Sequence, residues 1–144
     1  MKIRYPRVSF TCQRCAKCCM DSEERDRRII LLKCEVDEIS AYTGLPPEKF
    51  CRKAPEDLLE IYKPYEYEML KVNGKCVFLN GNTCTIYEKR PLVCRFHPFW
   101  LEKENDTWVF GVDTKCPGVS TQNPFDEQYF LKLLQTALTK LNKT

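Results

Sequence analysis

The spacing of apolar residues is most regular near the carboxy end of the chain, where it predicts a long amphipathic helix. Asn123 can cap a helix that begins at Pro124, because asparagine suits the N-cap and proline the first helical position. The apolar residues that follow recur with a helical period: Phe125, Tyr129, Phe130, Leu133, Leu134, Ala137, Leu138 and Leu141. We expect this stripe to pack on the rest of the domain, with a partner's groove as the alternative.

Shorter patterns predict strands and helices earlier in the chain. The apolar run over residues 28–32 suits a buried strand, and residues 36–42 have a helical spacing that ends at Gly44. A proline pair then favours a short helix over residues 48–53, since proline fits the first helical turn.

Two hairpins are predicted between these elements and the last helix. Asn73-Gly74 is a strong signal for a two-residue turn, because both residues tolerate positive φ, and it joins strands over 67–72 and 75–79. A second hairpin joins 99–102 to 107–112. Between the hairpins, a tight turn at 80–83 precedes a helical turn over 86–90.

Together these elements predict an α+β protein, organised as one small irregular domain over residues 1–144. Its parts are short hairpins, a C-terminal amphipathic helix and cysteine-ligated metal centres. With 43% hydrophobic and 30% charged residues, the chain of 144 residues has the composition of one ordinary globular domain.

Charge and hydropathy argue against nucleic-acid binding, secretion and membrane insertion. The net charge of +3 is too small to argue for nucleic-acid binding. The first ten residues lack the apolar run of a signal peptide, and no later stretch approaches membrane-spanning length. We therefore expect a cytoplasmic protein without membrane contact. In that compartment ten cysteines indicate metal ligation, with disulfides as the alternative.

Four of the cysteines fall within eight residues, at Cys12, Cys15, Cys18 and Cys19. Thiols spaced in this way can converge on one soft metal centre through a short turn. Adjacent side chains usually diverge, so Cys18 and Cys19 are expected to serve different centres. The stretch is interpreted as three ligands for one site and one ligand for another.

The remaining cysteines complete two sets of four thiolates in this interpretation. Cys34 and Cys51 are set aside as small core residues. A first centre would combine Cys12, Cys15 and Cys18 with Cys116, a remote cysteine followed by proline, as in a ferredoxin run. Cys19, Cys76, Cys84 and Cys94 would form the second. Other partitions stay open, including one complete site with leftover thiols.

Both iron–sulfur clusters and zinc suit such ligands. The repeated CxxC spacing favours [4Fe–4S], whereas a structural zinc would need no redox partner and would explain a small irregular fold. His97 is interpreted as a structural residue, with metal ligation as the alternative. Arg90 and Arg95 flank Cys94 and can either donate to cluster sulfides or pair with surface carboxylates.

At these residues the chain resembles the YkgJ-like CxxCxxCC cysteine-cluster family, which is associated with zinc or iron chelation. The matching pieces are the 12–19 stretch, Cys76-Val77-Phe78-Leu79, the segment from Cys84 to Arg95 with Pro98, and Cys116. The resemblance implies a metal or iron–sulfur centre. The same cysteine cluster occurs in a larger relative associated with flagellin lysine methylation.

The preferred function is therefore an iron–sulfur protein with one or two [4Fe–4S] clusters. It would transfer electrons or act as an accessory subunit of a redox or maturation system, with a protein partner. The alternatives are a structural zinc-binding interaction module and an accessory to a protein-modifying methyltransferase. No residue stands out as an acid, base or nucleophile, so the sequence leaves enzymatic activity open.

Overall fold

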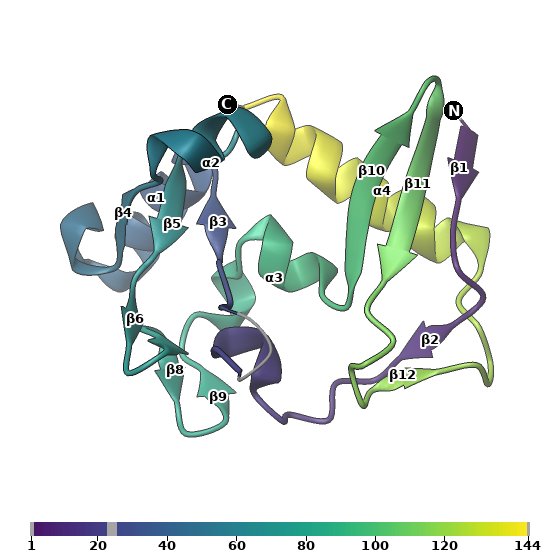
Figure 1. Ribbon diagram of the computed structural model, residues 1–144, viewed down its shortest axis with the longest axis horizontal. Helices are drawn as coiled ribbons and strands as arrows, with labels where there is room; N and C mark the ends of the chain where they lie inside the picture. The colour runs from purple at the N-terminus through teal and green to yellow at the C-terminus, as the bar shows by residue number, and fades with distance from the viewer. Residues whose placement is uncertain (1, 23–25, 144) are drawn as a thin grey trace. The chain divides into compact units, whose positions relative to one another are not determined.

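The computed structural model describes residues 2–22 and 26–143, which form helices and several short sheets (Figure 1). The chain divides into two compact units. Unit 1 consists of Met1–Gln13 and Phe96–Thr139, and unit 2 of Arg14–Arg95 and Lys140–Thr144. Within the described part of the chain, no helix has the length and apolar character needed to cross a membrane.

The elements are short apart from two helices and one hairpin. The helices are α1 (Lys33–Thr43), α2 (Glu56–Ile61), α3 (Leu92–Phe96) and α4 (Glu127–Leu141), with the 3₁₀ helices η1 (Lys17–Cys19), η2 (Pro47–Lys49) and η3 (Tyr87–Lys89). The strands are β1 (Lys2–Arg4), β2 (Ser9–Phe10), β3 (Ile30–Leu31), β4 (Cys51–Lys53), β5 (Tyr67–Met69), β6 (Lys71–Val72), β7 (Lys75–Cys76), β8 (Leu79–Asn80), β9 (Thr83–Cys84), β10 (Phe99–Glu104), β11 (Thr107–Val112) and β12 (Val119–Ser120). The predicted α+β class with a C-terminal helix is confirmed.

Unit 1 is built on the predicted hairpin of β10 and β11, to which β1 adds in parallel. Helix α4 lies behind this hairpin (Figure 1) and buries Phe130, Leu134 and Ala137. The Phe130 ring is the centre of an aromatic cluster, with centroid distances of 4.8 Å to Tyr5 and 5.0 Å to Phe110. The apolar stripe of α4 therefore packs against its own unit, as the sequence predicts.

The start of α4 differs from the prediction. Asn123 is not the cap, because its φ of 51° places it in the left-handed region ahead of the helix. The backbone N–H of Phe125 still bonds the carbonyl of Val8 at 2.9 Å, so the chain is not yet helical there. The Asp126 carboxylate instead accepts the N–H of Tyr129 at 3.1 Å, and the helix begins at Glu127.

Gly118 permits the close approach of β2 and the chain before β12. Its carbonyl accepts the N–H of Thr11, and a Cβ here would lie 2.2 Å from the Thr11 carbonyl oxygen. We expect Gly118→Ala to lower the free energy of unfolding by about 2 kcal/mol in urea denaturation, because backbone must move. Gly111→Ala is the control: its Cβ would meet the half-exposed Trp100 indole, which can swing outward. Equal losses in the two variants would contradict this explanation.

Unit 2 contains the sheet β3-β5-β4 and a hydrophobic core around Phe50. The apolar run over 28–32 supplies β3, with Leu31 and Leu32 fully buried, as predicted. The helix expected over 48–53 is wrong. Only η2 forms there, and β4 follows because Phe50 enters the core and Cys51 pairs with Met69 of β5. Sheet pairing outweighs the helix-starting preference of the prolines.

Helix α1 confirms the helix predicted over 36–42 and ends at Gly44, whose φ is 75°. It begins earlier than predicted because the buried carboxylate of Glu35 accepts the N–H of Leu32 at 3.0 Å. The other oxygen of Glu35 accepts the N–H of Leu92, the first residue of α3, at 2.6 Å. Lys140 pairs with that same oxygen at 3.2 Å. One buried carboxylate thus joins two helix starts.

The tight turns of unit 2 follow the prediction closely. Asn73 and Gly74 have φ values of 53° and 74° and connect β6 to β7. The turn predicted at 80–83 connects β8 to β9, and η3 forms the helical turn predicted over 86–90. Each turn precedes a segment that carries a cysteine, namely Cys76 in β7, Cys84 in β9 and Cys94 in α3.

Candidate metal centre

The CxxCxxCC stretch turns sharply before its last two cysteines. Arg14 and Ala16 have φ values of 54° and 65°, which are unfavourable for residues with a side chain and cluster at functional sites in proteins. The N–H of Cys19 bonds the carbonyl of Ala16 at 2.9 Å and closes η1. The Sγ atoms of Cys18 and Cys19 lie 3.9 Å apart. The expectation that these adjacent side chains diverge is therefore wrong.

Backbone pairing brings a third cysteine to this pair. Met20 forms an antiparallel bridge with Lys75, and the N–H of Asp21 bonds the carbonyl of Gly74 at 2.7 Å. Since antiparallel partners run in opposite directions, Cys19 lies across from Cys76. The predicted Asn73-Gly74 hairpin thus brings Cys76 to η1.

Two more cysteines reach the same apolar core from β9 and α3. Cys76 is buried within the cluster of hydrophobic side chains that includes Phe78 and Ile86. Cys19, Cys84 and Cys94 are partly buried and pack against that cluster. The four thiols assigned to the second centre therefore meet one core, and Cys18 accompanies them through its contact with Cys19.

The electrostatics show that the five thiols interact. Burial raises the pKa of Cys76, Cys84 and Cys94, that of Cys94 to about 12, and a charge on Cys18 raises all three further. The hydrogen bond from the Cys19 thiol lowers the pKa of Cys18 to about 6, and that same bond raises the pKa of Cys19. A raised pKa favours the neutral thiol, and a bound metal would instead stabilise the thiolates that ligation requires.

Arg27 lies beside the candidate site, although the cysteine spacing gave no signal for it in the sequence. Its Nε donates to the carbonyl of Cys18 at 2.7 Å. Its positive charge contributes to the lowered pKa of Cys18 and offsets part of the rise in the pKa of Cys76 and Cys94. Arg27 therefore supplies positive charge beside the cluster of five thiols, which consists of Cys18, Cys19, Cys76, Cys84 and Cys94.

The arginines predicted to flank the site have different roles. The charge of Arg90 contributes to the lowered pKa of Cys18 and offsets part of the rise in the pKa of Cys84. The Arg90 guanidinium lies over the Tyr87 ring at 3.8 Å. Arg95 donates to the backbone carbonyls of Arg90 and Glu88 at 3.0 and 2.7 Å. Arg95 thus binds backbone carbonyls and connects η3 to α3.

The other candidate ligands lie elsewhere in the chain. Cys12 and Cys116 belong to unit 1, where the bond from Thr11 to Gly118 puts both cysteines at one end of the β2–β12 pair. Cys15 belongs to unit 2 and is exposed. The division of all eight thiols into two centres stays a prediction.

The residues set aside as structural have ordinary packing roles. Cys51 is buried in the core cluster, and the Cys34 thiol donates to the carbonyl of Lys140 at 3.7 Å. His97 is partly buried in unit 1, with its ring edge against Phe10 at a centroid distance of 6.4 Å. No disulfide joins any of the ten cysteines, all of which are described.

The donor set decides which metals suit the cluster of five thiols. Across residues 2–22 and 26–143, no three Cys, His, Asp or Glu side chains are yet arranged to hold an ion. The donors near one another are all thiols, which suit zinc, iron or an iron–sulfur cluster and poorly suit magnesium or calcium. Cys18, Cys19, Cys76, Cys84 and Cys94 are thus candidate ligands for a soft metal.

Comparison with known proteins also points to binding of zinc or iron. Residues 11–117 match the CxxCxxCC family, described as a "putative zinc- or iron-chelating domain". One curated relative is Uncharacterized protein MJ0661 of Methanocaldococcus jannaschii, with 28% identity over 100 residues; the match covers 68% of this chain and 49% of the relative. The chain thus aligns with about half of that relative's length. No solved structure matches.

The match to the family covers both the dense cysteine stretch and every other cysteine that contributes to the cluster of five thiols. Together with the thiol donor set, this supports metal binding by the cysteines. The chain belongs to the CxxCxxCC family of zinc- or iron-chelating domains.

Proposed function

We propose that the chain is an iron–sulfur protein whose cluster is held by thiolates from the cluster of five thiols in unit 2. The observation that carries the proposal is the meeting of thiols from η1, β7, β9 and α3 on one apolar core. Five thiols exceed the four that a cubane requires, so one of the Cys18–Cys19 pair can remain outside. A second centre with Cys12, Cys15 and Cys116 belongs to the same proposal.

The surroundings of the thiols favour a redox role. Arg27 and Arg90 place positive charge beside them, and Cys76 lies inside the hydrophobic core. Net charge and burial are among the features that set the potential of an iron–sulfur cluster. The chain would then transfer electrons in the cytoplasm, or serve a redox or maturation system as an accessory subunit, through contact with a protein partner.

A structural zinc site is the second candidate, and the packing of the thiols favours it. Cys76, Cys84 and Cys94 come from three short elements of unit 2 that carry little regular structure of their own. A zinc ion bound to them would fasten these elements together, as in other small metal-stabilised domains. The protein would then be an interaction module without redox chemistry.

Anaerobic purification followed by metal analysis, acid-labile sulfide analysis and a visible spectrum tests the proposal. We expect brown protein with iron and sulfide in equal amounts, and with about four iron atoms per cluster. Colourless protein with stoichiometric zinc and no sulfide would overturn the electron-transfer role and establish the structural alternative. Protein that retains neither metal under these conditions would overturn both.

A further inference from the structure

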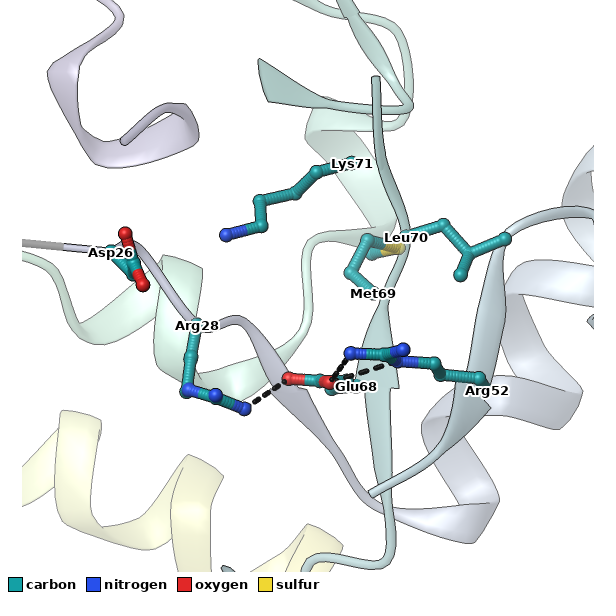
Figure 2. Close-up of a pocket in the computed structure, with 7 residues that line it drawn as sticks. All are labelled: Asp26, Arg28, Arg52, Glu68, Met69, Leu70 and Lys71. Carbon is teal, nitrogen blue, oxygen red and sulfur yellow. Dashed lines mark hydrogen bonds and ion pairs between the residues drawn. The ribbon is translucent and has the colours of Figure 1, made fainter. Parts of the chain in front are cut away.

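The sheet β3-β5-β4 carries a cavity of about 220 Å³, which no candidate cysteine lines. Its wall includes Arg28, Arg52, Glu68 and Lys71, drawn in Figure 2. The volume exceeds that of a single water several times, since one water takes about 30 Å³ in the liquid. The cavity therefore has room for a small solute.

Glu68 organises this cavity and is itself buried, with 5% of its surface exposed. One carboxylate oxygen accepts a bond from Arg28 at 3.0 Å. The other accepts two bonds from Arg52, at 3.0 and 2.7 Å. Arg52 also lies directly across from Glu68 in the sheet. Glu68 thus holds two guanidinium groups in place, one on either side of it (Figure 2).

The two arginines keep hydrogen-bonding capacity beyond Glu68. Among the described residues, the bonds to Glu68 take one nitrogen of Arg28 and two of Arg52. A guanidinium carries five N–H donors in a fixed plane, so each side chain retains donors for another acceptor. Both oxygens of Glu68 are already engaged, which makes this carboxylate unsuitable as a ligand for a cation.

The cations of the cavity are balanced by carboxylates, so an anion would be held by free N–H donors and not by excess charge. Arg28, Arg52 and Lys71 share the wall with Glu68 and Asp26. The amine of Lys71 is anchored by Asp21 at 2.8 and 3.0 Å. In Figure 2 the Lys71 side chain lies above Glu68, with its amine directed toward the side of Asp26. Fixed cationic donors around a small space are typical of sites for oxyanions.

We propose that this cavity is a binding site for a small oxyanion group, a phosphate or a carboxylate, received by the guanidinium groups of Arg28 and Arg52. The Glu68 carboxylate aligns the two groups before the ligand arrives. The proposal is independent of the metal centre, because no cysteine takes part in it.

Titration with inorganic phosphate and, separately, with acetate tests the site by two-dimensional NMR of the backbone amides. We expect saturable shifts at Met69, Leu70 and Lys71. Arg52→Gln should weaken binding about tenfold, which corresponds to about 1.4 kcal/mol. Stronger binding of phosphate would assign the site to phosphate groups, and stronger binding of acetate to carboxylates.

Matched variants separate the site from a general effect of charge. Arg4→Gln removes the same charge from an exposed arginine in unit 1 that also pairs with a glutamate, and it should leave binding unchanged. Arg52→Lys keeps the charge beside Glu68 and protects the fold, but should still weaken binding because lysine lacks the planar fork. Unsaturable shifts with either anion, or equal weakening by Arg4→Gln, would overturn the proposal.

Discussion

Cys94→Ser should deprive the chain of most of its bound metal, whereas Cys34→Ser should leave the metal content unchanged. Cys94 is partly buried and packs on the core cluster beside Cys19, Cys76 and Cys84. Structural zinc sites bind with about 10 to 16 kcal/mol, so one of four thiolates accounts for about 3 kcal/mol. The affinity for metal should then fall by about a hundredfold.

Competition with a chelator, followed by metal analysis of the protein, measures this loss. Cys34 is the matched control, because it is also partly buried in unit 2 but lies on α1 and directs its thiol to the carbonyl of Lys140. Serine preserves the size of both side chains and removes only the thiolate. If the two variants retain equal metal, Cys94 is not a required ligand, and its place in the proposed set of thiolates is wrong.

Local chemistry made several elements of the fold predictable. Asn73-Gly74 and Gly44 require positive φ, and the structure has it at each of them. The stripe of α4 predicts its buried face, since Phe130 and Leu134 are shielded. These signals are contained within a few residues, so no knowledge of distant contacts is needed to use them.

Elements that depend on distant partners were not predictable in this way. Residues 51–53 form a strand because β5, a separate segment, pairs with them. The start of α4 is set by Asp126 and by the bond between Phe125 and Val8, not by the Asn123-Pro124 pair. Helix α2 was missed because its short sequence, Glu56–Ile61, has no clear apolar stripe.

The same distinction applies to the candidate site. One of the partitions considered from the sequence left Cys19, Cys76, Cys84 and Cys94 as a set, and the structure packs all four against one core. Sequence could not show that Cys18 lies 3.9 Å from Cys19, nor that Arg27 bonds the carbonyl of Cys18. Both contacts depend on the left-handed backbone conformation of Ala16. An alanine gives no signal of that conformation in the sequence.

Glu35→Ala should destabilise the protein far more than a change at a partly exposed carboxylate of unit 2. The Glu35 side chain is 1% exposed and accepts the N–H groups of Leu32 and Leu92 while pairing with Lys140. Its removal leaves two buried donors and an ammonium group without this acceptor. Breaking a buried ion pair costs about 3 to 5 kcal/mol, a large part of the stability of a small domain.

Glu38→Ala is the matched control, because Glu38 also approaches Lys140, at 3.6 Å, but its side chain is 34% exposed. A solvent-exposed ion pair contributes at most about 1 kcal/mol. Urea denaturation of both variants measures the difference in the free energy of unfolding, and similar losses would contradict a special role for Glu35.

Because Leu92 begins α3, two residues before Cys94, the Glu35 variant should also bind metal more weakly at urea concentrations where it is still folded. Loss of stability without loss of metal affinity would show that Glu35 supports the fold alone and does not position the helix that carries Cys94.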